Sequence, residues 1–365
     1  MNFVQALQYC IDKNFCFAAY RLPYADAVRL VVQRNPVPLQ VKICRDLFEM
    51  QGFLISPFIE NDQNTHYLIR PDLNYISNDY IDLDALMELD PVPDHDILLH
   101  CPLVSKKEFL SQVEETKRAI GQKIFKKAVL ARVKNVKGDY RGKLTELFQL
   151  LRMSYPNAFV YLFNACGNLW MGATPEPLLC SRKNELESVS LAGTRSMNDE
   201  NLNLHNWSFK ERMEQELVTR FIEESLEKLR IPYLSKTGPY TKKAGNLIHL
   251  RTDFLFDFHE VDGKIDKLVK KLHPTSAVCG LPKKASMEFI LQTEKHNRSY
   301  YSGFLGPLNL DERLLLFVNL RCMQILPKQL LLHVGAGITA DSIAEEEWNE
   351  TELKAETLLS VIDKV

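Results

Sequence analysis

The sequence has no hydrophobic run near the roughly 20 residues that a membrane-spanning helix needs. Its first residues, MNFVQALQYCIDKN, lack the basic start, apolar stretch and small-residue cleavage site of a secretion signal. The net charge of −2 over 365 residues gives no electrostatic reason to expect nucleic acid or an anionic membrane as a partner. We therefore expect a cytoplasmic protein that binds neither.

Common site motifs are also missing. None of the eight cysteines forms a Cys-x-x-Cys pair, so the sequence gives little support for a zinc or redox centre. In a reducing compartment these cysteines are expected as small core residues. The sequence contains neither G-x-G-x-x-G nor G-x-x-x-x-G-K-[ST], so a glycine-rich nucleotide-binding loop and a simple Rossmann sheet are not expected.

The elements that the sequence does contain favour an α+β fold with large antiparallel sheets. Hydrophobic residues make up 45% of the chain and charged residues 25%, a normal balance for a globular protein with a sizeable core. Strand-like runs arrive in groups, without regular alternation with helices. FCFAAYRL, GFLISPF and HYLIR are such runs near the start, and DLDALMELDPVPDHD then forms an acidic connection whose leucines indicate packing. We expect one composite domain over 1–365, divided into a less recognisable portion, 1–105, and a motif-bearing portion, 106–365.

After residue 105 the hydrophobic periodicity becomes clearer. Helices are expected over 105–124, 143–155, 208–229, 264–272, 284–292 and 343–363. Strands are expected over 127–136, 159–165, 169–179, 185–194, 246–258, 314–326 and 329–337.

Two of the expected helices carry matching pairs of carboxylates. Glu211 and Glu214 lie three residues apart in KERMEQE, and Glu347 and Glu350 repeat this spacing in EEEWNETELK, with Lys354 four residues further on. Residues at this spacing share a helical face, where like charges repel each other mildly. A divalent cation relieves such repulsion, and Mg²⁺ typically takes one or two carboxylates with water and substrate oxygens. Solvated faces of glutamate-rich helices have the same pattern, so the spacing leaves both interpretations open.

Lys127 and Glu176 are candidate acid–base groups. Lys127 begins a strand of small apolar residues, where desolvation would lower its pKa and make it usable as a base. An exposed lysine at a strand start is the alternative. Glu176 lies between two prolines that fix the backbone, so its carboxyl group would be rigidly aimed and, with a raised pKa, able to protonate a leaving group. The alternative is an ordinary turn glutamate.

Further candidates lie at the ends of strand-like runs. Glycine-containing turns are expected at 192–194, 279–282 and 335–337, where backbone N–H groups can approach an anion closely; turns without a ligand would look the same. Arg321, inside LFVNLRCM, needs an anionic partner, which is either a bound carboxylate or a buried salt bridge. His249 either donates to a ligand hydroxyl or is a satisfied core histidine.

The order and wording of these segments together resemble the chorismate-utilising enzymes. The matching segments are KAVLAR, GATPEPLL, AGTR, KERMEQELV, HLRT, HPTSAVCGLPKKA, YSGFLGPLN, LRCM, VGAGI and EEWNETELK, from about Lys127 to Lys354. The family includes isochorismate synthases, salicylate synthases and the large subunits of anthranilate and aminodeoxychorismate synthases. The resemblance implies sheets stacked as a sandwich with helices outside, and makes 106–365 the chorismate-binding catalytic portion. One departure is AGTRSMNDE, where relatives more often have proline and glycine after the arginine.

The resemblance also implies a role for each matching residue. Lys127 would be the general base and Glu176 the general acid. Glu214 and Glu350 would bind Mg²⁺ directly, and Glu211 and Glu347 would hold water in its second shell. The positions that match contacts to chorismate are Gly193, Thr194, His249, Ala277, Tyr301, Arg321, Gly335, Gly337 and Lys354.

Lys127 and Ala277 favour one branch of the family. Amine-forming synthases typically carry glutamine where Lys127 stands, because ammonia needs no base to become a nucleophile, whereas water does. Salicylate synthases share the lysine but tend to have threonine in place of Ala277. The resemblance therefore predicts an isomerase, an isochorismate synthase that needs Mg²⁺ and chorismate and no obligatory protein partner. A salicylate synthase, an amine-forming synthase and a non-catalytic binding module are the alternatives, and a menaquinone or a siderophore pathway is equally compatible.

Overall fold

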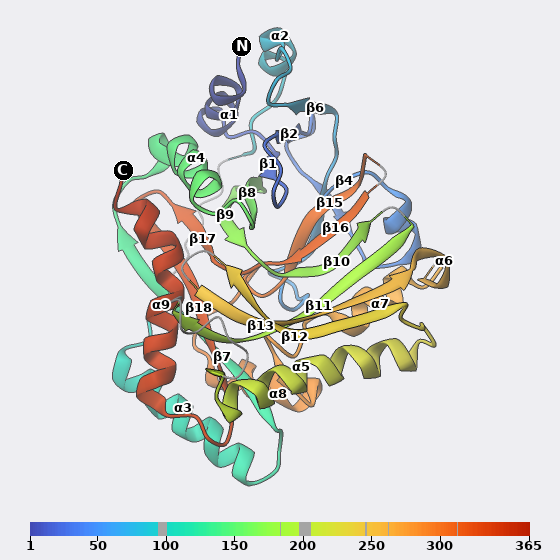
Figure 1. Cartoon of the computed structure of the whole chain (residues 1–365). Coiled ribbons are helices and arrows are strands. Elements are labelled where there is room, and N and C mark those ends of the chain that lie inside the picture. Colours follow the sequence, from blue (N-terminus) through green and yellow to red (C-terminus); the bar gives the residue numbers. More distant parts are fainter. Residues whose placement is uncertain (94–100, 183, 197–205, 245–246, 262, 312) are drawn as a thin grey trace.

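Two stacked antiparallel sheets form the centre of the molecule, seen here in a computed structural model (Figure 1). The structure describes residues 1–93, 101–182, 184–196, 206–244, 247–261, 263–311 and 313–365. Within these ranges each sheet has nine strands. Helices lie on the outer sides of the sheets, so the expected α+β sandwich with external helices is confirmed.

The first sheet combines strands from both ends of the chain. Its strands are β1 (Phe17–Arg21), β2 (Val28–Val32), β6 (Leu73–Ile76), β7 (Lys127–Lys137), β8 (Phe159–Ala165), β9 (Asn168–Thr174), β14 (Gly280–Leu281), β17 (Cys322–Leu326) and β18 (Gln329–Ile338). They are arranged in the order β14-β7-β18-β17-β9-β8-β1-β2-β6.

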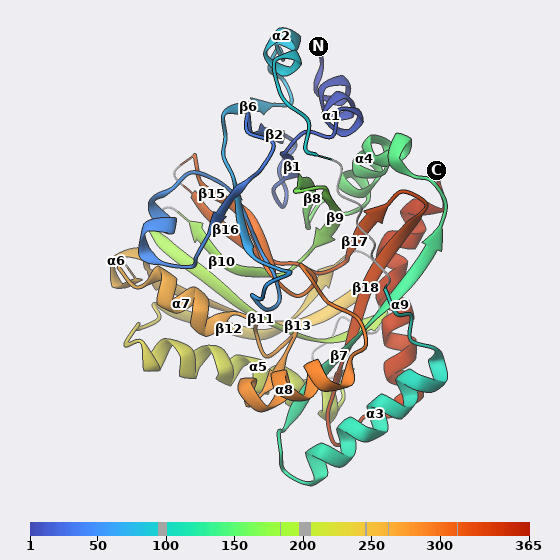
Figure 2. The ribbon, with the colours of Figure 1, turned by 180° about the vertical axis from the view of Figure 1, so that it is seen from behind.

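The second sheet is built in the same way. It contains β3 (Leu39–Val41), β4 (Gly52–Ser56), β5 (His66–Ile69), β10 (Pro177–Arg182), β11 (Glu185–Ser196), β12 (Ser235–Ala244), β13 (Leu247–Asp257), β15 (Phe304–Leu310) and β16 (Arg313–Val318). Its order is β12-β13-β11-β10-β16-β15-β4-β5-β3. Strands from before residue 105 therefore contribute to both sheets, as the view from behind also shows (Figure 2). The division at residue 105 stays a prediction.

Each sheet is covered by its own helices. The outer face of the first sheet packs on α1 (Phe3–Asp12), α4 (Leu144–Ser154) and α9 (Ala344–Ile362) in one apolar cluster. The second sheet packs on α5 (Phe209–Lys228) and α7 (Ile265–Leu272). The remaining helices are α2 (Leu83–Met87), α3 (Lys106–Gly121), α6 (Phe258–Val261) and α8 (Lys283–Thr293), with short 3-10 turns η1 (Arg45–Glu49) and η2 (Arg141–Lys143). No helix in the described ranges is long and apolar enough to cross a bilayer.

Between the sheets lies an aromatic core. Because side chains alternate along a strand, β8 turns Val160 and Leu162 toward the helices and Phe159 and Tyr161 toward the other sheet. Phe159 stacks on Phe317 of the second sheet, with ring centroids 4.3 Å apart and an interplanar angle of 3°. This stacking ties the sheets together beside the segments that pass from one to the other.

Two segments that we expected as single strands are each divided between the sheets. The run 169–179 becomes β9 and β10, with Glu176 at the crossing, and the run 314–326 becomes β16 and β17, with Arg321 at the crossing. These expectations were wrong because an apolar run does not show where a chain leaves one sheet. The signals for a break are the prolines beside Glu176 and the positive φ of Arg321, +49°.

The three expected glycine turns contain strand residues instead. Residues 192–194 lie inside β11, at a register shift, residues 335–337 lie inside β18, and the central residues of 279–282, Gly280 and Leu281, form β14. The acidic connection packs as expected, with Leu86, Leu89 and Val92 buried. Its last residues, 94–96, lie outside the described ranges, as does the end of AGTRSMNDE from residue 197. The other expected helices and strands after residue 105 are present, with small shifts of their ends.

Candidate active site

One pocket brings together most of the candidate residues, from both sheets and two helices. Those that line it are Glu176, Gly193, Thr194, Glu214, His249, Ala277, Tyr301, Arg321, Gly335, Gly337, Glu350 and Lys354. Lys127 lies beside this lining through its contact with Glu214. Glu211 and Glu347 lie behind it on α5 and α9, the two helices that bring the acidic pairs to the pocket.

Lys127 is buried at the first position of β7. Its side chain has no exposed surface, and its Nζ lies 2.8 Å from Oε1 of Glu214. This close approach needs the bare backbone of Gly337, since a Cβ there would lie 2.4 Å from Glu214 Oε1 and 3.0 Å from Lys127 Cε. The expected desolvation of Lys127 is confirmed, but the lysine lies on the same side of the pocket as Glu214, within ion-pairing distance.

Glu176 has the ionisation expected of a general acid near neutral pH. Burial raises its pKa from 4.5 to about 7, although the positive charges of Arg321, Lys127 and Lys354 oppose this shift. Its backbone is fixed by the crossing, because its carbonyl accepts from Val318 N at 2.9 Å. A protonated carboxyl group in a polar pocket can donate to a departing oxygen.

His249 faces the pocket with a defined tautomer. Its Nδ1 lies 2.8 Å from the carbonyl oxygen of Gly193, which can only accept, so Nδ1 carries the proton. Burial, reinforced by Arg321, lowers the pKa of His249 to about 3, so the ring is neutral and Nε2 is an acceptor. Nε2 is buried without a hydrogen-bond partner within the described structure. The imidazole would thus accept from a ligand hydroxyl, which corrects our expectation that it donates.

Basic and phenolic groups surround the same space. Arg321 lies at the second crossing, and its carbonyl accepts from Ala173 N at 3.1 Å. Lys354 donates to the carbonyl of Gly335 at 2.9 Å and to Oε1 of Glu350 at 2.5 Å. A Cβ on Gly335 would lie 2.8 Å from the hydroxyl of Tyr301, so this glycine makes room for the tyrosine. The positively charged side chains and the phenol hydroxyl together can bind an anion.

The four glutamates are each paired with a basic side chain. The pairs are Glu214 with Lys127 (2.8 Å), Glu350 with Lys354 (2.5 Å), Glu347 with Lys210 (2.5 Å) and Glu211 with Arg195 (2.6 Å). Within the described ranges no three His, Cys, Asp or Glu side chains lie close enough to hold a metal ion. The direct roles expected for Glu214 and Glu350, and the water-mediated roles expected for Glu211 and Glu347, stay predictions.

The carboxylates nevertheless have the chemistry of a magnesium site. Glu214 and Glu350 both present hard oxygen donors to the pocket. Burial raises the pKa of Glu347 to about 7, and repulsion from the neighbouring Glu350 adds to this rise; a divalent cation would relieve the second, smaller effect. Burial alone would raise the pKa of Glu214, but Lys127 and more distant lysines outweigh it and lower the pKa. The residues present fit Mg²⁺.

Sequence reasoning missed the basic partners of the two rear glutamates. Lys210 immediately precedes Glu211, yet it reaches across to Glu347 on α9, a contact between residues 137 positions apart. Arg195 holds Glu211 through two parallel hydrogen bonds of 2.6 Å. The lysine and arginine were visible next to recognised segments, but only the approach of the two helices shows which carboxylate each one binds.

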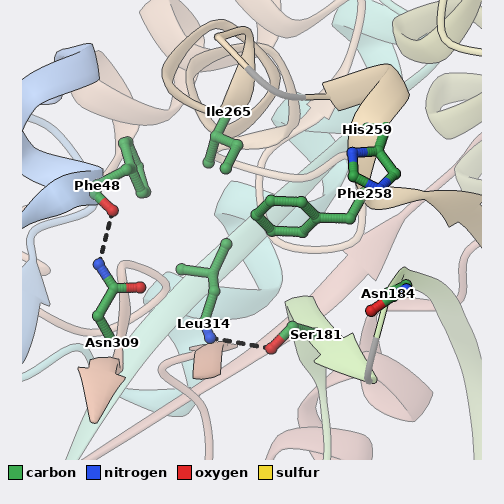
Figure 3. Close-up of a pocket in the computed structure, with 8 residues that line it drawn as sticks. All are labelled: Phe48, Ser181, Asn184, Phe258, His259, Ile265, Asn309 and Leu314. Carbon is green, nitrogen blue, oxygen red and sulfur yellow. Dashed lines mark hydrogen bonds between the residues drawn. The ribbon is translucent and has the colours of Figure 1, made fainter. Parts of the chain in front are cut away.

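A different cavity, of about 240 Å³, lies between residues of β10, β15, β16, α6, α7 and η1 (Figure 3). Its lining residues are Phe48, Ser181, Asn184, Phe258, His259, Ile265, Asn309 and Leu314. Half of these side chains are apolar and half are polar, and the amide of Asn309 donates to the carbonyl of Phe48 at 2.6 Å. None of the candidate acid–base groups reaches it, so the chemistry is assigned to the pocket around Glu176.

Comparison with known proteins shows the family of the chain. The model of a family described as "Chorismate binding enzyme" matches residues 72–363. The chain belongs to this family. The match covers α5, α9 and both crossings, and so includes every candidate residue.

Curated relatives of this member of the family come from several branches. It is similar to isochorismate synthase EntC of Escherichia coli strain K12, with 30% identity over 64% of this chain and 62% of the relative. It is 28% identical to a salicylate biosynthesis isochorismate synthase of Pseudomonas aeruginosa, over 71% of this chain and 56% of the relative. For anthranilate synthase component 1 of Aquifex aeolicus the identity is 25%, over 71% and 53%. The matches thus span between half and two thirds of each relative's length.

Solved structures share the whole fold. DhbC of Bacillus anthracis superimposes with a TM-score of 0.78 at 21% identity, covering 99% of this chain and 100% of that one. MenF, the menaquinone-specific isochorismate synthase of Escherichia coli, gives 0.76 at 22% identity, with 98% and 91% covered. At these identities the likeness establishes the architecture alone.

The contact between Glu214 and Lys127 depends on Gly337, which predicts the effect of a methyl group there. Gly337→Ala should push the two side chains apart and weaken chorismate binding by about tenfold or more, because small displacements in such a site are costly. Isothermal titration with chorismate measures this. Gly121→Ala is the matched control, since a Cβ there meets nothing within 4 Å. Equal affinities of both variants and the wild type would contradict the assignment.

The raised pKa of Glu176 predicts a pH-dependent stability difference. Since its folded-state pKa, about 7, exceeds its usual value of 4.5, its contribution is fully present below pH 4.5 and is lost as the pH rises through 7. Glu176→Gln removes this loss, so its melting temperature relative to the wild type should rise between pH 5 and pH 8. The full effect is about 3 kcal/mol. The exposed change Glu288→Gln should show a constant difference, and a constant difference for Glu176→Gln would refute the buried acid.

Proposed function

We propose that this protein is an isochorismate synthase, which adds water at C2 of chorismate and removes the C4 hydroxyl. The observation that carries the proposal is a buried lysine, Lys127, beside the pocket that contains Glu176, a buried carboxyl group with a pKa near 7. Water needs a base to become a nucleophile, and hydroxide is a poor leaving group without an acid. The two residues supply these two functions at one pocket.

Each acid–base group has a distinct task in this reaction. Lys127, in its uncharged form, takes a proton from the attacking water. The ring double bond shifts, and Glu176 gives its proton to the departing C4 oxygen. The two groups belong to one site, because Glu214, which contacts Lys127, lines the same pocket as Glu176. Proton transfer by positioned groups commonly contributes about 10²–10⁴-fold each.

Other residues orient the substrate. Arg321 and Lys354 supply positive charge for its carboxylates, and the hydroxyl of Tyr301 lies beside Gly335 in the lining. The bare Nε2 of His249 accepts from a ring hydroxyl. Oriented binding of this kind brings the reacting atoms into an attack geometry.

Magnesium fits the same proposal. Glu214 and Glu350 would hold it directly, and Glu211 and Glu347 would hold its water. When bound, the ion supplies positive charge that anchors a substrate carboxylate. Glu214 thus has two possible partners: it contacts Lys127 Nζ at 2.8 Å and would also be a ligand of the ion. The expected cytoplasmic location and the expected lack of an obligatory protein partner stay predictions.

Product analysis tests the proposal. Wild-type protein with chorismate and Mg²⁺ should form isochorismate, separated by chromatography. Lys127→Gln and Glu176→Gln should still bind chorismate but turn it over about 10²–10⁴-fold more slowly. Lys126→Gln, an exposed neighbour on the same strand start, is the control and should keep full turnover.

Other products in this assay would identify a different function. Salicylate with pyruvate would identify a salicylate synthase, and products formed only with ammonia would identify an amine-forming synthase. Unchanged chorismate would identify a binding module. Normal turnover in either glutamine variant would remove the role given to that residue.

The metal assignment gives a separate prediction. Glu214→Gln and Glu350→Gln should each weaken Mg²⁺ binding, measured by titration calorimetry in the presence of chorismate, by about tenfold or more. Glu346→Gln, an exposed change on the same helix, should leave it unchanged. Full wild-type activity in EDTA would show that the glutamates serve another purpose.

A further inference from the structure

A buried ion pair lies directly behind the pocket and belongs to none of the roles assigned so far. Arg298 and Glu294 follow α8, and both side chains are 3% exposed. Nε of Arg298 donates to Oε2 of Glu294 at 2.8 Å, and Nη2 contacts Oε1 at 2.5 Å. The guanidinium also lies 4.3 Å from the ring centre of Phe58.

The pair completes the open edge of β7. One edge of β7 is paired along its length with β18, but on the other edge β14 reaches only Lys127 and Ala128. Beyond it, the carbonyl of Val129 accepts from Nη2 of Arg298 at 2.6 Å, and the N–H of Ala131 donates to Oε1 of Glu294 at 2.7 Å. Arginine only donates and a carboxylate only accepts, so together they offer the strand what a neighbouring peptide would offer.

The same guanidinium reaches two further parts of the pocket wall. Nη1 donates to the carbonyl of Val278 at 2.9 Å, which fixes the segment of Ala277 and Val278. The ring of Tyr301 lies 5.9 Å from the guanidinium, and Tyr301 N donates to the carbonyl of Arg298 at 2.9 Å. Val129, Val278 and Tyr301 all line the pocket, and Val129 is two residues from Lys127. One cation thus contacts three separate segments of the wall.

Stability alone does not account for such a pair. Burying two charges is costly, and well-packed apolar residues at such positions are often as stable or more so. The planar guanidinium of Arg298 donates hydrogen bonds in several fixed directions. It therefore sets the distances between the segments that it joins, which apolar side chains cannot do.

We propose that Arg298 and Glu294 act as a positioning unit for the chorismate pocket: they hold β7, the Ala277–Val278 segment and Tyr301 in register, and so place Lys127 toward the substrate. The proposal rests on the proposed function in so far as the pocket is taken to be the chorismate site. Both are positioning residues, since they act through the segments that they join.

Arg298→Lys tests the proposal, because lysine keeps the charge but cannot serve Val129, Val278 and Glu294 with one planar fork. We expect chorismate affinity at 25 °C to fall about tenfold or more and kcat to fall with it. Arg21→Lys is the matched control. Arg21 is also 3% exposed and donates to four backbone carbonyls, but it is outside the pocket lining. It should lower the melting temperature and leave the affinity unchanged.

A second variant covers the case in which Arg298→Lys does not fold. Glu294→Gln keeps an acceptor for Ala131 N and removes only the charge, so we expect a smaller loss of affinity in the same direction. The double variant should be no weaker than the weaker single variant, since the two residues act as one unit. Additive losses would contradict this.

Hydrogen exchange gives a readout that needs no substrate. Peptides covering 127–133 and 276–281 should exchange faster in Arg298→Lys, and peptides of β8 should not. If the wild type binds chorismate and Arg298→Lys binds it equally well, the positioning role is overturned, whatever the melting temperature does. If the wild type neither binds nor converts chorismate, the proposed function fails, and unchanged exchange in 127–133 and 276–281 would overturn the positioning role separately.

Discussion

The structure depends on two chain crossings that lie side by side between the sheets. The first leads from β9 to β10 past Glu176, and the second leads from β16 to β17 past Arg321, in the opposite direction. Hydrogen bonds tie them together, from Val318 N to the carbonyl of Glu176 and from Ala173 N to the carbonyl of Arg321. Since β9 pairs with β17 and β10 pairs with β16, one antiparallel ribbon runs through both sheets. An acid and a cation far apart in sequence are therefore held in one pocket by backbone geometry, before any side-chain contact is made.

Burial at this crossing also determines ionisation. In the same pocket it raises the pKa of Glu176 to about 7 and lowers that of His249 to about 3, so one carboxyl group can keep a proton and one imidazole can accept a hydrogen bond near neutral pH. The same physical cause thus yields a donor and an acceptor, because desolvation always disfavours the charged form. The nearby positive charges of Arg321 and Lys354 modify both values without reversing either.

Much of this site was predictable from sequence because its residues lie in regular elements with readable periods. The helical faces of Glu211 with Glu214 and of Glu347 with Glu350 follow from spacing three, and Lys127 on a strand follows from its apolar neighbours. The family resemblance then predicted that these residues line one pocket. What could not be predicted depends on pairs of distant segments: where 169–179 and 314–326 change sheets, which nitrogen of His249 carries the proton, and which base each glutamate meets. Local sequence does not determine these three features, because each depends on a contact with a segment that is distant in the sequence.

The pairing of each glutamate with its own base has a consequence for how ligands enter. Glu214 and Glu350 are already neutralised by Lys127 and Lys354, so a divalent cation alone would add unbalanced positive charge to a pocket that also contains Arg321. Chorismate alone, with its two carboxylates, would add one negative charge more than Arg321 balances. A divalent cation and the doubly negative substrate together leave the net charge of the pocket unchanged. In a poorly solvated site an unbalanced charge costs more free energy than in water. We therefore expect metal and substrate to favour each other's binding, and Glu214, which contacts Lys127 and lines the pocket, would be the carboxylate that lies between the ion and the base.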